Sequence, residues 1–440
     1  MIKTISRFLT LMVQRYLPDP LVFAIFLTII VFVLGIAITP SGPLAMVKMW
    51  GDGFWNLLAF SMQMAMVLVT GHALASSPLL RRGMRNLAKV AKTPAQGVML
   101  VAFMSAVCSA LNWGFGLVVG ALFAREVARR VAGSDYRLLI ASAYIGFITW
   151  HGGISGSVPL VAATKGNPME ATVGLIPISQ TLFTPYNIFI TVALIVVVPF
   201  LCKSMLPKPE EVIAVDPSLL AEEPPTSKVV GPNATWAEKV EESTFLAMLV
   251  GAFGCIYLAM YFAKNGFNIN VNTVNLIFFT AGIMLHKTPM SYMRAVINAA
   301  RGTAGILVQF PLYAAIQVMM EHSGLGGIIT NWFVNISTKD TFAVLAFFSS
   351  GLVNLAVPSG GGHWVVQGPF VMPAAQALGT DLGKAAMAIA YGEEWMNMAQ
   401  PFWALPALAI AGLGVRDIMG YCVTALIWTL PIFLIGLYFL

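Results

Sequence analysis

Charged residues are scarce in this chain of 440 residues. Only 10% are Asp, Glu, Lys or Arg, whereas 58% are hydrophobic. Soluble domains carry about 25% charged and about 45–50% apolar residues. A water-soluble enzyme, a disordered protein and a nucleic-acid-binding protein are therefore excluded. The apolar segments run for about 20 residues, the length that crosses a bilayer as a helix, which predicts an all-α polytopic membrane protein.

Cysteine and catalytic signatures are also lacking. The four cysteines are far apart, with no CxxC spacing and no histidine nearby. This pattern argues against a disulfide framework, a redox motif or a cysteine metal site. No HExxH, GxSxG or paired Asp/His motif occurs in the sequence. We therefore expect neither an enzyme nor a bound cofactor.

Lys and Arg are absent from three long stretches, at 93–124, 138–164 and 340–383. A substrate with two or three carboxylates usually requires a fixed cation, for which Arg is the bidentate choice. Their absence favours a substrate that has one carboxylate and a short apolar tail. A bound Na⁺ could replace the missing charge, so a carrier of dicarboxylates stays open.

The apolar segments divide the chain into five parts. They are an N-terminal tail (1–20), a first membrane half (21–206), a proline-rich linker (207–243), a connecting membrane helix (244–265) and a second membrane half (266–440). Basic residues precede the first apolar run, which is too long for a signal-peptide core, so we predict a membrane helix there and not a cleaved signal. Uninterrupted spans lie at 21–39, 54–75, 186–205, 244–263, 271–286, 303–321 and 418–440.

Four further apolar segments are interrupted by Gly, Pro and polar residues. Such clusters unwind a helix, which is tolerated in a membrane only within protein or beside water. We predict breaks at Asn112–Gly116 in segment 99–131, His151–Ser157 in 138–163, Pro358–His363 in 341–378, and Gly392–Glu394, continuing to Pro401, in 382–412.

The two halves of the chain, 21–206 and 266–440, resemble each other. Matching residues recur in the same order at offsets of 246 or 247, namely Asp135 and Asp381, Gly146 and Gly392, and Pro159 and Pro406. If 99–131 and 341–378 are re-entrant hairpins while 138–163 and 382–412 cross, 20 of the 25 Lys and Arg residues lie on the side of the N-terminus. The positive-inside rule then places that side in the cytoplasm and makes the repeats inverted. Inverted repeats with broken helices indicate a secondary transporter.

The hairpin tips are the predicted substrate site, because helix N-termini at mid-membrane attract anions. Asn and Gly at a tip could instead only cap the two arms. If Na⁺ is the coupling ion, we expect it near Asn112 and Ser359. The expected substrate-binding residues are Asn112, Gly114, Ser155, Ser157, Ser359, Gly360, Gly361 and His363.

Glu393 and Glu394 are the predicted coupling residues, together with Asn397 and His151. A charged group at the bilayer centre costs at least ~2.5–3.5 kcal/mol, so acids kept there usually have a function. Nearby amides could instead satisfy the acids, and His151 could only hold loop backbone. The sequence leaves open whether H⁺ or Na⁺ is coupled and which glutamate faces the cavity.

Several long motifs resemble the short-chain fatty acid transporter family. They are NLAVPSGGGHWVVQGPFVMPAAQALG from Asn354, YGEEWMNMAQPFWALPALAIAGLGVRDIMGY from Tyr391, MVKMWGDGFWNLLAF from Met46 and NWGFGLVVGALFAREVARR from Asn112. The resemblance covers essentially the whole chain. It implies uptake of short-chain monocarboxylates, such as acetoacetate and butyrate, across a bacterial inner membrane. It also implies the ion-transporter fold of inverted repeats with two hairpins.

We therefore expect a secondary carrier that imports short-chain fatty acids by symport with H⁺ or Na⁺. The expected partners are the monocarboxylate, membrane lipid and a second copy in a homodimer, and no nucleic acid. The alternatives are a carrier for another small carboxylate such as a dicarboxylate, a channel, which would not show saturable flux, and a membrane enzyme, which would form a product.

Overall fold

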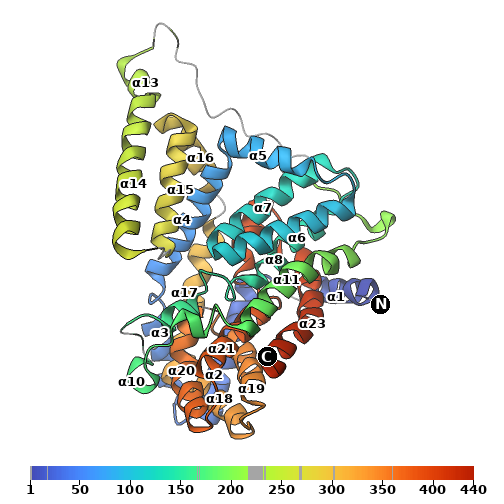
Figure 1. The fold of residues 1–440 in the computed structure, drawn as a ribbon, viewed down its shortest axis with the longest axis vertical. Coiled ribbons are helices and arrows are strands. Elements are labelled where there is room, and N and C mark those ends of the chain that lie inside the picture. Colours follow the sequence, from blue (N-terminus) through green and yellow to red (C-terminus); the bar gives the residue numbers. More distant parts are fainter. Residues whose placement is uncertain are drawn as a thin grey trace.

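The computed structural model describes residues 2–16, 18–165, 167, 169–216, 231, 234–266, 270–300, 303–358 and 360–440. Within these ranges every regular element is a helix (Figure 1). The first half contains α1 (Ile2–Tyr16), α2 (Pro20–Ile38), α3 (Pro43–Gly53), α4 (Leu58–Ala75), α5 (Pro78–Ala88), α6 (Pro94–Leu111), α7 (Trp113–Arg130), α8 (Tyr136–Gly146), α9 (Ser157–Ala162), α10 (Glu170–Val173) and α11 (Pro185–Ser204).

The second half begins after the linker. It contains α13 (Trp236–Glu241), α14 (Thr244–Asn265), α15 (Val271–His286), α16 (Pro289–Ala300), α17 (Ala304–His322), α18 (Leu325–Asn335), α19 (Phe342–Asn354), α20 (Gly360–Ala377), α21 (Leu382–Met396), α22 (Ala404–Ala411) and α23 (Val415–Phe439). Each uninterrupted apolar span expected from the sequence coincides with one helix. Of the predicted linker, residues 217–230, 232 and 233 lie outside the described residues.

Several helices have the length and composition to cross a bilayer. In the described ranges these are Leu21–Ile38, Pro94–Leu111, Pro185–Ser204, Trp236–Asn265 and Val415–Phe439, and a sixth if the pair Ser61–Ala75 and Pro78–Ala88, bent by 77°, forms one span. On α14, at the edge of the molecule in Figure 1, Phe245, Phe253 and Met260 are 71%, 64% and 66% exposed. Apolar surface of this kind requires lipid or another apolar cover. The chain is a multi-pass helical membrane protein.

Each of the four interrupted segments contains a helix break. Helices α6 and α7 pack together and are separated only by Asn112, whose side chain accepts a hydrogen bond from the Phe115 N–H at 3.0 Å. Helices α19 and α20 flank the second break. The loop Trp150–Gly156 separates α8 and a 3₁₀ turn (Phe147–Thr149) from α9, and residues 397–403 separate α21 from α22.

Two predicted breaks differ in extent from what was expected. Helix α21 continues through Gly392, Glu393 and Glu394 and ends at Met396, since Gly392 fits a helix that is closely crossed by another. The break comes before Pro401, which lacks an N–H and disfavours a helical residue in front of it. The other break is shorter than expected, because α20 starts at Gly360 and His363 lies in its first turn.

Two tight helix crossings hold the centre of the fold, and they occupy matching places in the two halves. A Cβ at Gly146 of α8 would lie 2.6 Å from Ser105 Cβ of α6. A Cβ at Gly392 of α21 would lie 2.6 Å from Ser350 Cβ and 2.1 Å from the Phe347 carbonyl oxygen of α19. Both serines also donate a hydrogen bond to a carbonyl on the crossing helix, Ser105 to Ala143 at 2.5 Å and Ser350 to Ile389 at 2.6 Å.

The crossings predict a stability effect. Gly146→Ala and Gly392→Ala should each lower the free energy of unfolding by about 1–3 kcal/mol, because neither site has room for a methyl group. Thermal unfolding of the detergent-purified protein measures this change. Gly51→Ala in α3 is the control, since nothing lies within 4 Å of its added Cβ. Equal melting temperatures for all three variants would contradict the close crossing.

Helices α8 and α21 are the most enclosed elements. Every residue of α8 except Arg137 is buried, as are the residues of α21 from Ala385 to Trp395. Both helices begin with an aspartate cap, in which Asp135 accepts from the Leu138 N–H and Asp381 from the Lys384 N–H. The two helices carry the central polar residues into the interior.

Candidate functional site

Glu393 and Glu394 lie in the last turn of α21, deep inside the molecule. The loop after α8 meets them, because the glycines at 152, 153 and 156 prevent that segment from continuing as a helix. His151 in this loop contacts both acids. Its Nε2 lies 3.0 Å from Glu393 Oε2, and its backbone N–H donates to Glu394 Oε2 at 2.7 Å. These three side chains are 0%, 0% and 1% exposed, respectively, so the cluster is closed to solvent in this conformation.

Amide and phenol groups bind the cluster to the surrounding helices. The Asn397 Nδ2 donates to Glu393 Oε2 at 3.2 Å. Asn354 of α19 donates to the Glu393 carbonyl oxygen at 3.1 Å and to Asn397 Oδ1 at 2.9 Å, and the Tyr144 hydroxyl of α8 donates to the Asn397 carbonyl oxygen at 2.8 Å. Elements of both halves of the chain thus support the same acids.

A second polar contact supports the loop that carries His151. Asn187 of α11 donates to the carbonyl oxygens of Gly152 at 3.0 Å and Leu182 at 2.7 Å. Its Oδ1 accepts a hydrogen bond from the Tyr391 hydroxyl of α21. The loop is therefore fixed to α21 from two sides, by the acids and by this phenol.

Several buried polar atoms of the cluster lack a hydrogen-bond partner among the described residues. They are Glu393 Oε1, Glu394 Oε1, His151 Nδ1 and Ser157 Oγ. A buried polar atom left unpaired costs about 1–3 kcal/mol, and more if it is charged. Two of the four are carboxylate oxygens, which accept protons or cations. The arrangement can therefore take up a proton, a cation or a polar ligand.

The N-terminus of α20 is close to this cluster. A Cβ at Gly360 would lie 2.1 Å from Ser157 Oγ and 2.8 Å from His151 Cε1, whereas a Cβ at Gly361 would have no neighbour within 4 Å. The positive dipole end of α20 thus begins beside His151 and Ser157. Ser359, the predicted tip residue, lies outside the described residues.

His363 is held between α20 and α19. Its Nδ1 lies 3.0 Å from the Val357 carbonyl oxygen, and its Nε2 lies 2.9 Å from Ser350 Oγ and 3.1 Å from Gln367 Oε1. These contacts connect the first turn of α20 to α19 and to the helix crossing at Ser350. His363 is therefore linked through Ser350 to α21, the helix that carries the acids.

The break between α6 and α7 contacts the loop after α8 at its other end. Ser155 Oγ accepts a hydrogen bond from the Trp113 N–H at 3.0 Å, and the Ala110 carbonyl oxygen accepts from the Ile154 N–H at 2.9 Å. The Asn112 Oδ1 caps α7, and Gly114 packs against the Val67 side chain. The hydrogen bonds found for Asn112 and Ser155 in the described residues stay within α6, α7 and the loop.

Tryptophans form an apolar wall beside the acids. The ring of Trp150 lies on that of His151, with centroids 3.6 Å apart. Trp113 and Trp403 lie 6.2 and 5.7 Å from Trp150, and all three are buried. A polar cluster with an adjoining apolar wall matches the two ends of an amphiphilic anion.

Broken helices that meet around buried carboxylates in a multi-pass membrane protein are typical of secondary transporters. The sequence profile described as "Short chain fatty acid transporter" matches residues 1–440. The chain belongs to the short-chain fatty acid transporter family, which confirms the prediction made from the motifs. Because the family and the relatives below are transporters, the prediction that the chain is not an enzyme is also confirmed.

Two relatives are similar over their full lengths. A protein of Escherichia coli, provisionally named a short-chain fatty acid transporter, is 67% identical over 437 residues, 99% of each chain. A protein of Haemophilus influenzae with the same provisional name is 62% identical over 447 residues, 100% of each chain. Among solved structures, the Alcanivorax borkumensis YdaH transporter has 17% identity and a TM-score of 0.45, over 95% of this chain and 98% of that one.

Proposed function

We propose that this protein imports short-chain fatty acids such as acetoacetate and butyrate across a bacterial inner membrane, by symport with H⁺ or Na⁺. The observation that carries the proposal is the pair of buried hydrogen-bond contacts that His151 makes with Glu393 and Glu394. Two carboxylates beside one imidazole hold more negative charge than that partner can balance. Binding a proton or Na⁺ removes the excess, so occupancy by the ion stabilises the closed state.

The substrate carboxylate is proposed to bind at the N-terminus of α20. Gly360 brings that helix end beside Ser157 Oγ, a hydroxyl without a partner among the described residues. The hydrogen bonds found there for the two glutamates come from His151 and Asn397, not from Lys or Arg. A helix end and a hydroxyl suit a single carboxylate, while the tryptophan wall suits a short acyl tail.

The two halves are proposed to be inverted repeats that alternate access to this site. The matching aspartate caps of α8 and α21 support this, as do the matching crossings at Gly146 and Gly392. The N-terminus is proposed to be cytoplasmic, with α6–α7 and α19–α20 as re-entrant hairpins. Helices α6 and α7 each have 18 residues and are about 27 Å long, which is enough to cross a bilayer. Figure 1, however, shows them at a steep angle to α14 and α15, and this orientation favours re-entrant helices over crossing ones.

Uptake of labelled butyrate into proteoliposomes tests the proposal. Na⁺ and proton gradients are imposed separately, with succinate as competitor. Protein-free liposomes are measured in parallel, because butyric acid crosses lipid unaided. We expect saturable uptake above the lipid background, driven by one gradient and insensitive to succinate. Uptake that does not saturate would indicate a channel, and strong competition by succinate would indicate a dicarboxylate carrier.

A further inference from the structure

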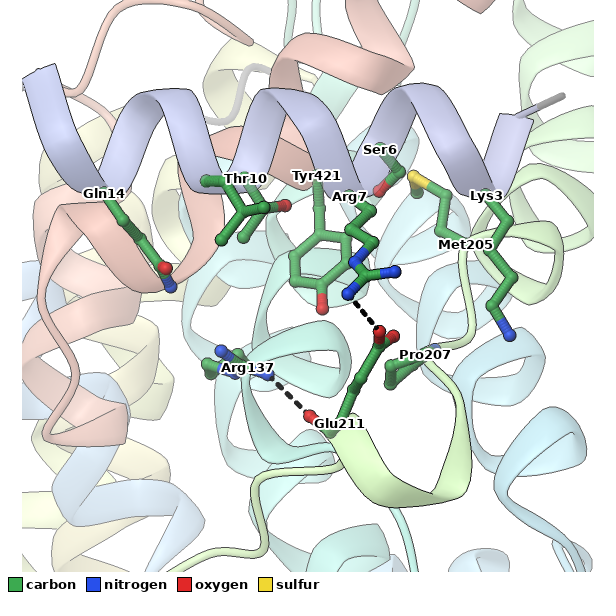
Figure 2. A pocket seen from close by; sticks show the side chains of 11 residues that line it. Lys3, Ser6, Arg7, Thr10, Gln14, Arg137, Met205, Pro207, Glu211 and Tyr421 are labelled. Carbon is green, nitrogen blue, oxygen red and sulfur yellow. Dashed lines mark hydrogen bonds and ion pairs between the residues drawn. The ribbon is translucent and has the colours of Figure 1, made fainter.

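A cavity of about 180 Å³ lies away from the acid cluster, at the opposite end of α8 (Figure 2). It is lined by residues of α1, of the N-terminal parts of α8 and α23, and of the segment from Met205 to Glu211. Helix α8 has 11 residues and is on the order of 16 Å long. The cavity is thus separate from the proposed transport site but connected to it by one helix.

Positive charge predominates on the walls of this cavity. Lys3, Arg7 and Arg137 line it, against Glu211 as the one acidic lining residue. The Arg7 guanidinium lies 3.0 Å from Glu211 Oε1, as the dashed line in Figure 2 shows. Arg137 pairs with Asp135 at 2.8 Å and donates to the Glu211 carbonyl oxygen at 3.3 Å. Against Glu211 and the Asp135 that pairs with Arg137, the three cations leave an excess of one positive charge.

Buried hydrogen-bond donors face the same space. Ser6 and Thr10 of α1 are 1% and 8% exposed, and neither hydroxyl has a hydrogen-bond partner in the described part of the chain. The Arg137 Nε is also buried without a partner. A buried polar group left unpaired costs about 1–3 kcal/mol. Three unpaired donors next to an excess of positive charge can bind an oxyanion.

Close packing of α1 on α23 explains why these hydroxyls point inward. A Cβ at Gly420 would lie 2.2 Å from the Thr10 Cα, so only glycine allows α1 to approach this closely. The other side of α1 exposes Phe8 and Tyr16, which are 64% and 69% accessible. An amphipathic helix of this kind lies at a membrane surface, which leaves the cavity open to both soluble anions and lipid headgroups.

We propose that this cavity is a binding site for a small oxyanion, a carboxylate or phosphate group, held by Arg7, Lys3 and the Ser6 and Thr10 hydroxyls. About 10–15 Å³ of such space is enough to hold one water molecule, so 180 Å³ has room for several non-hydrogen atoms. Inorganic phosphate has five. The bound group is either a soluble anion or the phosphate of an anionic lipid.

Binding to the purified full-length protein in detergent tests the site, with no need for uptake. Isothermal titration with inorganic phosphate is the soluble arm. Titration with short-chain phosphatidylglycerol, compared with phosphatidylcholine, is the lipid arm. We expect one of the two arms to show saturable binding to a single site, and that arm identifies the source of the oxyanion. No saturable binding of phosphate or phosphatidylglycerol would overturn the proposal.

Two charge variants should have opposite effects on that dissociation constant. Arg7→Gln is expected to weaken binding about tenfold, because one cation is lost. Glu211→Gln is expected to strengthen binding by a similar factor, because the acidic lining residue that competes for the cations is neutralised. Arg15→Gln is the matched control on α1, since Arg15 is over the Tyr16 ring and does not line the cavity. If both variants weakened binding equally, the Arg7–Glu211 ion pair would be only structural.

A further variant tests the hydroxyls without changing charge. Ser6→Ala with Thr10→Val keeps the volume of α1 against α23 and should weaken binding about fivefold, with an unchanged melting temperature. Wild-type affinity in this double variant would show that the hydroxyls do not contact the ligand and would overturn their assignment.

Discussion

Glu393→Gln is expected to lower gradient-driven butyrate uptake about a hundredfold. The substitution keeps the size of the side chain but removes the negative charge beside His151 Nε2. It also replaces one of the two carboxylate oxygens, of which Oε1 has no partner among the described residues. Removal of one member of a buried, paired group typically costs about 3–5 kcal/mol, and a hundredfold loss corresponds to roughly 2.7 kcal/mol. Initial uptake rates in proteoliposomes, corrected for the amount of inserted protein, measure the effect.

Exchange separates loss of coupling from loss of binding. Glu393→Gln should still exchange external labelled butyrate for internal butyrate, because exchange requires no net movement of the coupling ion. Glu394→Gln should reduce driven uptake only about tenfold, since a Gln oxygen can still accept from the His151 N–H. Glu241→Gln on the exposed helix α13 is the control. A larger loss for Glu394→Gln than for Glu393→Gln would reverse the two roles.

Gly360→Ala is expected to abolish uptake, whereas Gly361→Ala should retain nearly all of it. The two glycines are neighbours in the first turn of α20, and both variants add one methyl group. At Gly360 the methyl would lie 2.1 Å from Ser157 Oγ, so Ser157 and His151 would have to move. At Gly361 nothing lies within 4 Å. Uptake at equal membrane abundance compares them directly.

Rescue of the Gly360 variant would show that the loss comes from this contact. Overpacking costs about 1–3 kcal/mol, which a folded membrane protein usually tolerates, so Gly360→Ala should still reach the membrane. The double variant Gly360→Ala with Ser157→Gly lacks the hydroxyl that the added methyl group would contact. It should therefore recover part of the uptake that Gly360→Ala loses. Equal activity of the Gly360→Ala and Gly361→Ala variants would argue against a site at this helix end.

The sequence predicted most helices because long apolar runs need no tertiary information. Breaks were predicted from Gly, Pro and polar clusters, and this worked for the loop that contains His151. It placed the start of the break after α21 too early, because the glycine at 392 serves a helix crossing and not a break. A glycine pattern alone does not distinguish these uses, whereas Pro401, five residues after the helix end, was the better signal.

For the candidate site, individual residues could be predicted but most contacts could not. His151, Glu393 and Asn397 stand out as polar residues in apolar segments, yet His151 is 242 positions from Glu393, and only tertiary packing joins them. Asn354 and Tyr144 were missed, although an Asn within an apolar run was a usable signal for the first. For Asn112, the sequence left open a site or a cap; its Oδ1 does cap α7, and a part in substrate binding stays a prediction.

The close contact between the rings of Trp150 and His151 has an optical consequence. A protonated imidazole accepts an electron from an excited indole, whereas a neutral imidazole quenches it far less. With the ring centroids 3.6 Å apart, the emission of Trp150 should report the protonation state of His151. Tryptophan fluorescence recorded during a pH jump, with Trp150→Phe subtracted as background, would then follow protons entering the acid cluster in the unlabelled protein.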